Sequence, residues 1–223
     1  KGATNMPPRM IVHGVQGIGK TTLAASAPAP IFIQTEDGMG VLDAPRFPLA
    51  ETYEDVNDAL ISLGTQDHSY QTLVIGYGKG YNMALDIWGD FIGALNYLRA
   101  QKNMNIILLA HTQVVKYNDP SSEPYDRYTI NLHKNAGAKM LEFADAVLFA
   151  NYRTTVTTTD AGFGQKKSRA LGSGERVIFT EERPSHIAKN RYALPAEIPL
   201  DWSRLAEFIP YLNQTQPQMK ETA

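Results

Sequence analysis

The sequence predicts one α/β domain with a doubly wound, mostly parallel sheet and helices on both faces. Short apolar strands alternate with amphipathic helices along the chain, which is the order of βα units in such sheets. Hydrophobic residues make up 43% of the 223 residues and charged residues 20%, both ordinary values for a globular protein. We therefore expect one domain over residues 10–210, with an N-terminal extension at 1–9 and a flexible tail at 211–223.

Each strand is predicted from a short apolar run that leads into a polar or glycine-rich segment. The first helix should begin near Gly19, and the third carries an apolar stripe from Ala84 to Leu98 that includes Trp88. Two polar stretches at 114–139 and 154–173 lack clear periodicity, so we expect long loops there. In chain order, the predicted elements are strands at 10–13 and 31–34, a helix at 53–63, and strands at 72–75, 105–110 and 146–150.

A glycine-rich turn joins the first strand to the first helix and matches G-x-x-x-x-G-K-[ST] in full. Glycines in such a loop let backbone N–H groups converge on phosphates, and the helix N-terminus adds its positive dipole. Lys20 should reach the β- and γ-phosphates of ATP, and the Thr21 hydroxyl should bind Mg²⁺. The strand before the motif and the helix after it argue against a chance match. The predicted nucleotide-binding residues are Gly14, Val15, Gln16, Gly17, Ile18, Gly19, Lys20, Thr21 and Thr22.

The segment after the second strand resembles the RecA family. In that family a glutamate just beyond this strand polarises the attacking water, and Glu36 stands at the matching position. Asp37 is the alternative base, and both acids could instead cap a turn. The fourth strand leads to His111, where RecA-like ATPases place a γ-phosphate sensor, with Gln113 as the alternative. A histidine at a strand end can also be purely structural.

Lys189 and Arg191 resemble the Lys-x-Arg motif of RadA- and DnaB-type relatives. In those proteins the two cations reach the γ-phosphate held by the neighbouring subunit, Lys as a point charge and Arg as a planar fork. The resemblance implies a homo-oligomer, either a ring or a filament, with nucleotide at the subunit interfaces. The alternative is a solvated basic turn.

A set of short motifs narrows the resemblance to phage ATP-binding proteins, related to RecA, that act in single-strand annealing and recombination. The resemblance covers roughly residues 10–208. It implies ATP- and Mg²⁺-dependent binding of single-stranded DNA, pairing of complementary strands and DNA-stimulated hydrolysis of ATP, alongside a single-strand-binding protein in the host cytoplasm. The motifs occur together and in order at 35–38, 78–81, 109–111, 118–120, 124–128, 132–134, 144–145, 148–152 and 188–191.

One position departs from the family pattern. An aspartate that supports Mg²⁺ through water should follow the third strand, whereas Ile75 is followed by Gly76. Either the protein lacks this acid, or residues of the encoded chain between Ile75 and Gly76 are missing. Apolar strand residues that run directly into a glycine-rich loop make an awkward βα unit, which favours the second explanation. We assign no aspartate to this role.

The predicted DNA path is the polar stretch after the sensor strand, because this stretch lines the DNA in RecA-like proteins. Its cations and aromatic residues suit a single strand, whose exposed bases stack without sequence preference. For each residue alone, a solvated surface charge is the simpler interpretation. The candidates are Lys116, Tyr117, Arg127, Tyr128, His133, Lys134 and Lys139, with Tyr125 in the same stretch and Lys79, Lys166, Lys167 and Arg169 elsewhere.

Composition argues against several other classes of protein. The net charge of −2 is unlike that of a dedicated duplex-DNA binder, and the lack of cysteine excludes disulfides and thiolate metal sites. No apolar run is long enough to span a bilayer and no signal-like start is present, so we expect a cytoplasmic protein without a membrane partner. Two alternatives stay open: a ring-forming helicase or translocase, and a single-strand binder that ATP switches without hydrolysis.

Overall fold

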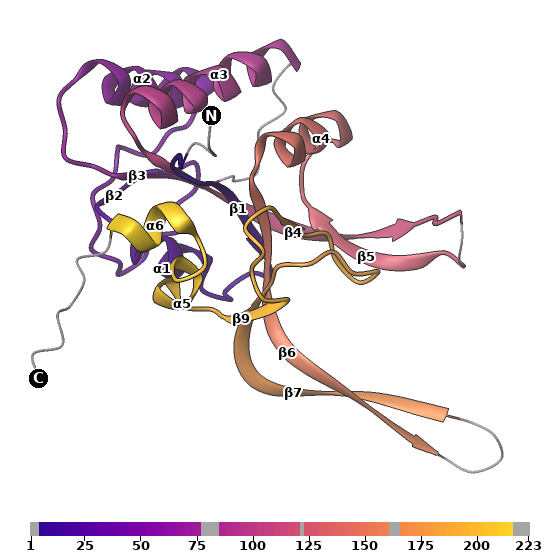
Figure 1. The fold of residues 1–223 in the computed structure, drawn as a ribbon. Helices are drawn as coiled ribbons and strands as arrows, with labels where there is room; N and C mark the ends of the chain where they lie inside the picture. Colours follow the sequence, from indigo (N-terminus) through magenta and orange to yellow (C-terminus); the bar gives the residue numbers. More distant parts are fainter. Residues whose placement is uncertain (1–4, 77–84, 121–122, 161–165, 216–223) are drawn as a thin grey trace, which may run out of the picture.

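The computed structural model describes residues 5–76, 85–120, 123–160 and 166–215. The chain forms a three-layer body, with a sheet between two layers of helices, and a long two-stranded arm projects from it (Figure 1). No helix in the described residues is both long and apolar enough to cross a membrane.

The sheet is mostly parallel, which confirms the predicted fold class. Its parallel strands lie in the order β2-β3-β4-β1-β6, so β4 is inserted between β1 and β3. These strands are β1 (Arg9–Gly14), β2 (Pro30–Ile33), β3 (Thr72–Gly76), β4 (Asn105–Tyr117) and β6 (Ala146–Asp160). The antiparallel additions are β5 (Tyr125–Ile130), β7 (Lys166–Phe179), β8 (Lys189–Asn190) and β9 (Glu197–Pro199).

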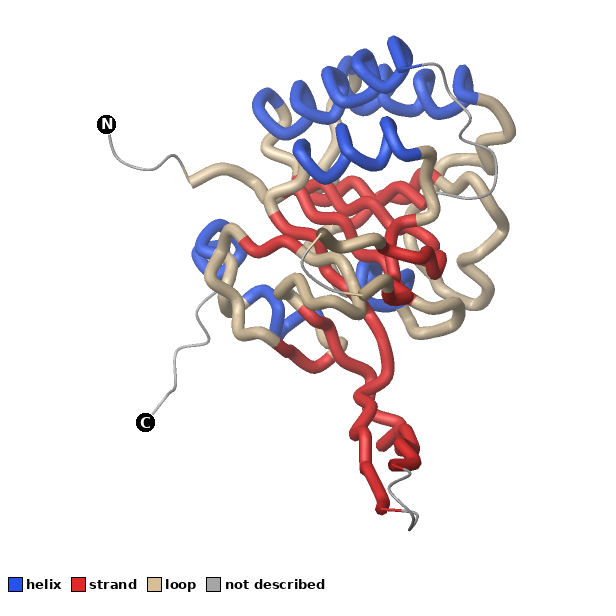
Figure 2. Tube along the Cα trace, turned by 90° about the vertical axis from the view of Figure 1, so that its right-hand side faces the viewer, coloured by secondary structure: helices blue, strands red, loops and turns tan. Residues whose placement is uncertain are grey.

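Helices cover both faces of the sheet (Figure 2). One face packs against α2 (Tyr53–Thr65), α3 (Leu85–Gln101) and α4 (Lys134–Phe143), and the other against α1 (Lys20–Ala25), α5 (Trp202–Ala206) and α6 (Pro210–Thr215). Strand residues alternate between the two cores, because successive side chains point to opposite faces. In β4, Ile106 and Leu108 face the α2–α4 side, while Ile107 and Leu109 face the other.

The two stretches expected to be long loops are built mainly of β-hairpins. β4 continues to Tyr117 and returns as β5, and β6 and β7 stay paired as far as Asp160 and Lys166. The outer part of the second hairpin, residues 154–160 and 166–172, is called the arm below (Figures 1 and 2). The sequence expectation was wrong here because strands outside the core need no apolar alternation, and Thr, Tyr and Val favour strands.

The ordered chain also extends beyond Pro210, where the flexible tail was expected to begin. Leu212 lies in α6 and is buried in the same core as Trp202 and Leu205. An apolar side chain in this core fixes the helix to the body. The limits of the domain themselves remain a prediction.

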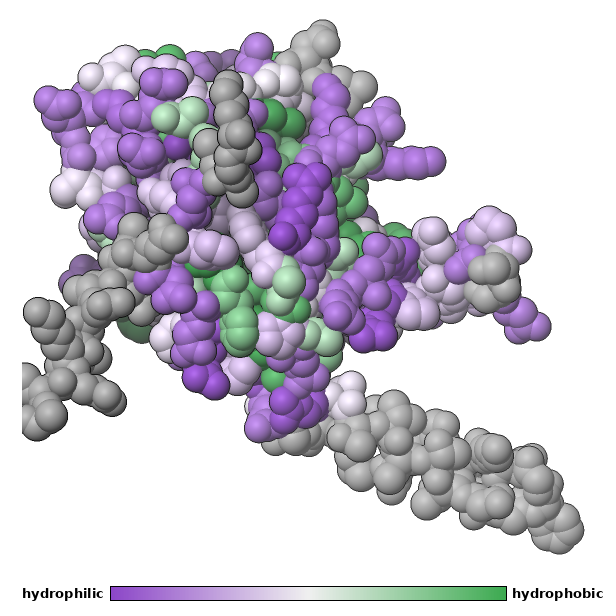
Figure 3. Space-filling view, in the orientation of Figure 1, coloured by the Kyte–Doolittle hydropathy of each residue, from purple (hydrophilic) through white to green (hydrophobic). Residues whose placement is uncertain are grey.

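The face of the body seen in Figure 3 is mainly hydrophilic.

Candidate nucleotide-binding site

The predicted phosphate-binding loop lies between β1 and α1. Its backbone has φ values of +74° at Gly17 and +107° at Gly19, a region that glycine adopts without strain. Gly19 is the N-cap of α1, which begins at Lys20. The loop therefore presents its backbone at the start of a helix, the arrangement that binds phosphate groups.

Gly14 is also required by the neighbouring strand. β1 and β6 pair here in parallel, with Gly14 beside Ala150. A Cβ atom on Gly14 would lie 2.1 Å from the Ala150 carbonyl oxygen, far inside van der Waals contact. The first glycine of the motif thus allows β6 to pack directly against the start of the loop.

Lys20 is folded back over the loop. Its Nζ donates hydrogen bonds to the carbonyl oxygens of Gly14, at 3.0 Å, and Val15, at 3.1 Å. Burial lowers the pKa of Lys20, and the nearby Glu36 carboxylate acts in the opposite direction. Phosphate oxygens would be stronger partners for this ammonium than neutral carbonyls, because both members of that pair carry charge.

The base and the sensor assigned from the sequence touch each other. Glu36 follows β2, while His111 lies in β4 directly beside Gly14 of β1. His111 Nε2 lies 2.8 Å from Glu36 Oε1, and the two side chains are 32% and 46% exposed. Gln113, the alternative sensor, donates instead to the Ile130 carbonyl, at 3.3 Å, within the β4–β5 hairpin. The fold therefore brings Lys20, Glu36 and His111 to the carboxyl edge of the parallel strands.

The expected acid after the third strand has no counterpart in the described residues. β3 ends at Gly76, whose carbonyl accepts a 2.5 Å hydrogen bond from the Thr35 hydroxyl. Among the described residues, no atom lies within 4 Å of a Cβ atom placed on Gly76. The described residues also contain no group of three or more His, Asp or Glu that could hold a metal ion.

Lys189 and Arg191 lie at the opposite edge of the sheet. β8 pairs with the start of β6, where Asn190 stands beside Ala146, and Ala146 stands beside Met10. Gly14, the first residue of the P-loop, lies four residues after Met10 along β1, a distance of about 13 Å. Lys189 Nζ donates to the Leu141 carbonyl at the end of α4, at 2.6 Å. The ammonium group of Lys189 is therefore already hydrogen-bonded to the backbone in the described structure.

Arg191 joins a cluster around a single carboxylate. Asp145 Oδ1 lies 2.8 Å from Arg9 Nη2 and 3.4 Å from Arg191 Nη1, and Asp145 Oδ2 lies 3.4 Å from Arg99 Nη2. Arg9 and Arg99 are mostly buried, whereas the Arg191 side chain is 53% exposed. Of these three guanidinium groups, that of Arg191 is the one open to an external anion.

The candidate DNA contacts divide into exposed and enclosed residues. Lys116 and Tyr117 are exposed on the β4–β5 hairpin. His133 and Lys134 are exposed at the start of α4, and Lys139 is partly buried on the same helix. These residues come from two elements rather than from one flexible loop.

Arg127 does not present a free charge at the surface. Its side chain is 7% exposed and pairs with Glu182, and its guanidinium lies 4.8 Å from the centre of the Tyr117 ring. Tyr128 is partly buried, with its ring 5.2 Å from that of Phe149. In the described structure this cation holds the hairpin to the body, and its contact with phosphate stays a prediction. Sequence alone does not show which cations of a polar stretch are paired.

Four further cations are candidates for contact with DNA. Lys79 lies outside the described residues. Lys166, Lys167 and Arg169 belong to β7 near the end of the arm, where the structure describes the backbone pairing.

His13, which was assigned no role from the sequence, lies one residue before the P-loop and is fully buried. Its Nε2 lies 3.0 Å from the Ile187 carbonyl oxygen, which can only accept, so Nε2 carries the proton. Nδ1 then accepts from the Thr112 hydroxyl at 3.0 Å. Burial lowers the pKa of His13 to about 4, which keeps the ring neutral. The signal in the sequence was a polar residue inside an otherwise apolar strand.

Sequence analysis also did not identify Arg176, whose Nη1 lies 3.4 Å from the Ile18 carbonyl oxygen.

A family model described as AAA domain matches residues 6–76 and 75–192. The chain belongs to the AAA domain family. The two matched segments of this AAA domain meet at Ile75 and Gly76, the junction at which the expected acid is missing. A search of curated proteins gives no match.

Two solved structures are similar to this AAA-domain chain. The RadB recombinase is 14% identical, with 84% of this chain and 87% of that chain covered and a TM-score of 0.50. The flagellar accessory protein FlaH from Methanocaldococcus jannaschii is 12% identical, with 81% and 88% covered and a TM-score of 0.40. The fold is a RecA-like P-loop NTPase core.

Proposed function

We propose that this AAA-domain protein is an ATPase in which Glu36 orients and deprotonates the attacking water. The observation that carries this proposal is the position of Glu36, in contact with His111 at 2.8 Å and close enough to Lys20 to influence its pKa. A carboxylate beside the γ-phosphate site can hold a water in line with the bond that breaks. Lys20 would neutralise charge on the β- and γ-phosphates, and bound Mg²⁺ would supply further positive charge.

The reaction balances with these groups. The water oxygen forms a bond to the γ-phosphorus, and the bond between that phosphorus and the β–γ bridging oxygen breaks. The water proton passes to Glu36 and then to solvent, and ADP leaves with the electron pair of the broken bond. In the described state Glu36 is held by His111. A γ-phosphate oxygen that accepts the hydrogen bond of the His111 ring N–H in place of Glu36 would free Glu36 for the water.

We propose single-stranded DNA as the partner, with annealing or strand pairing as the outcome. Support comes from the ordered motifs, which resemble those of phage annealing proteins, and from the exposed Lys116, Tyr117 and Lys134. A structure of the same fold is described as a recombinase. The protein would act as a ring or filament, together with a single-strand-binding protein.

A second candidate function is a binder that ATP switches without hydrolysis. Gly76 favours it, because this residue occupies the end of β3, where the acid is expected. Mg²⁺ in such sites is usually bound through one or two carboxylates as well as the phosphates.

Glu36→Gln separates the two candidates. For an ATPase, this change should leave ATP affinity near that of the wild type and lower single-turnover hydrolysis about 100-fold or more, because a positioned base is lost. The matched control is Asp37→Asn, which removes the neighbouring exposed acid and should leave the rate unchanged. Lys20→Ala should abolish ATP binding in calorimetry. Glu36→Gln with a wild-type rate would remove Glu36 from this role, and a wild type that binds but never hydrolyses ATP would favour the switch.

Removal of both Lys116 and Lys134 tests the DNA path. The double alanine variant should reduce the slope of log affinity against log salt for single-stranded DNA by about 1.4, because each phosphate contact on a single strand contributes about 0.7. Lys102→Ala combined with Arg204→Ala removes the same charge from other surfaces and should keep the wild-type slope. An unchanged slope in the Lys116 and Lys134 variant would place the DNA elsewhere, with the arm as the next candidate.

A further inference from the structure

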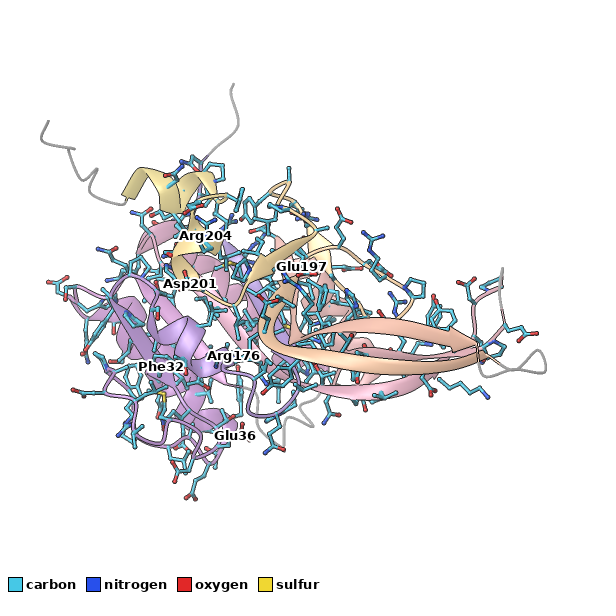
Figure 4. All side chains as sticks on the ribbon, turned by 90° about the horizontal axis from the view of Figure 1, so that it is seen from below. Phe32, Glu36, Arg176, Glu197, Asp201 and Arg204 are labelled. Carbon is cyan, nitrogen blue, oxygen red and sulfur yellow. The ribbon has the colours of Figure 1, made fainter. Side chains whose placement is uncertain are left out.

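Arg176 brings a cation to the P-loop from the base of the arm. It lies in β7 opposite Tyr152 of β6, just inside the point where the two strands leave the body. Its Nη1 donates to the Ile18 carbonyl at 3.4 Å. Figure 4 labels Arg176 beside the first helix, on the side of the molecule that also carries Glu36.

The close approach of Arg176 depends on Gly19. A Cβ atom on Gly19 would lie 3.0 Å from Arg176 Nη1 and 3.5 Å from Leu200 Cδ2. Leu200 is itself held by a 2.9 Å backbone hydrogen bond to the Arg176 carbonyl. Gly14 stands in the same relation to Ala150 of β6. Two glycines of the motif therefore let the P-loop pack against both strands that form the base of the arm.

The charge of Arg176 is not compensated by a carboxylate among the described residues. Two carboxylates of the adjoining strands, Glu175 in β7 and Glu197 in β9, both bind the guanidinium of Arg153. Arg176 is exposed, and its hydrogen bond to Ile18 uses a neutral carbonyl. An exposed guanidinium that rests on a phosphate-binding loop without an anionic partner is suited to bind an anion brought to that loop.

We infer that Arg176 binds a phosphate oxygen of the nucleotide held by its own P-loop. This inference rests on the proposed function, because it takes the nucleotide as the ligand of the loop. Arg176 differs from Arg191, which lies at the other edge of the sheet and could reach only the nucleotide of a second copy. Lys20 and Arg176 would then approach the polyphosphate as two cations of one subunit. Since β7 continues into the arm, the contact would also join the nucleotide to the strand that carries the arm.

The test compares Arg176→Ala, Arg176→Lys and the control Arg204→Ala, which removes an exposed arginine from α5. ATP affinity is measured by calorimetry at several salt concentrations. Arg176→Ala should weaken ATP binding about 10- to 100-fold, the range expected for loss of a hydrogen bond between charged groups. Arg176→Lys should retain part of the affinity, and Arg204→Ala all of it. Arg176→Ala should also show a shallower dependence of ATP affinity on salt, because a charge pair has been lost.

The salt dependence separates a phosphate contact from a structural role. If Arg176 only positions the loop through Ile18, the affinity falls while its salt dependence stays that of the wild type, and the inference is overturned. Wild-type affinity in Arg176→Ala overturns it as well. Lys20→Ala reports on the proposed function independently. If Lys20→Ala loses ATP binding while Arg176→Ala keeps it, only the inference has failed, whereas full binding by both variants contradicts the nucleotide site itself.

Discussion

Charged side chains have different surroundings at the two edges of the parallel sheet. At the carboxyl edge, Lys20 is held by neutral carbonyls, and Glu36 has His111 as its partner on a half-exposed surface. At the amino edge, Asp145 lies among Arg9, Arg99 and Arg191. The first edge keeps charged groups available for a ligand, and the second uses them to hold elements of the fold together. Arg191 belongs to the second edge by position, yet its exposure would allow it to serve the first edge of another subunit.

The largest expected effect comes from Arg191, which would act at the carboxyl edge of a neighbouring subunit. Arg191→Ala should still bind ATP, because its own P-loop is intact, but should hydrolyse it on the order of 10³-fold more slowly, as for loss of an arginine finger supplied in trans. Asp145 keeps Arg9 and Arg99 in this variant, so the fold should remain stable. Rates per subunit should rise with wild-type protein concentration as copies assemble.

A mixture of Arg191→Ala and Lys20→Ala gives the decisive measurement. Each variant alone should be nearly inactive, but some interfaces in a mixed assembly pair an intact P-loop with an intact finger. Part of the activity should then return. Arg183→Ala, which removes another exposed arginine, is the control and should hydrolyse ATP at the wild-type rate. A mixture that co-assembles by light scattering yet stays inactive would return Arg191 to the structural cluster of the amino edge.

A change at Asp145 should sharpen the contrast, because it affects folding rather than ligand binding. Asp145→Ala leaves the mostly buried Arg9 and Arg99 without their carboxylate, which should destabilise the protein by about 3–5 kcal/mol. Denaturant unfolding of Asp145→Ala and the wild type measures the loss, with Asp58→Ala as a control for removal of an exposed carboxylate. At denaturant concentrations below its unfolding transition, the Asp145→Ala variant should bind ATP with wild-type affinity. Weakened ATP binding in the folded variant would show that the two edges are coupled.

The Asp145 carboxylate should also account for part of the loss of folding stability at acid pH. Burial alone would raise the pKa of Asp145, but the hydrogen bonds and charges of Arg9 and the charge of Arg99 lower it below its usual value. Because the folded pKa is lowered, this contribution to stability is present at neutral pH and is lost as pH falls through the folded pKa.

The contrast between the edges also explains what the sequence could predict. The P-loop, Glu36 and His111 follow strands whose apolar runs are clear, and parallel strands bring their carboxyl ends together. Arg176 could not be found this way, because its contact with Ile18 depends on an antiparallel strand from a distant part of the chain. The pairing of Arg127 with Glu182 depends likewise on tertiary structure. The position of β4 between β1 and β3 and the two hairpins became known only from the structure.

The smallest expected effect comes from His13, which lies between the two edges and one residue before the P-loop. Burial lowers the pKa of His13 from 6.5 to about 4, with the positive charge of Lys20 acting in the same direction. Above pH 6.5 the ring is neutral in both folded and unfolded chains and contributes no pH dependence. Between pH 6.5 and 4 the unfolded chain binds the proton more readily, so stability falls as pH falls, by about 3 kcal/mol in total. His13→Gln should be less stable at neutral pH, since it disturbs the bonds to Thr112 and Ile187, but should lack this part of the pH dependence. Urea unfolding of both proteins from pH 7 to pH 4 gives the difference directly. Parallel stability curves across that range would show that His13 binds its proton equally in both states, which contradicts the lowered pKa of the buried ring.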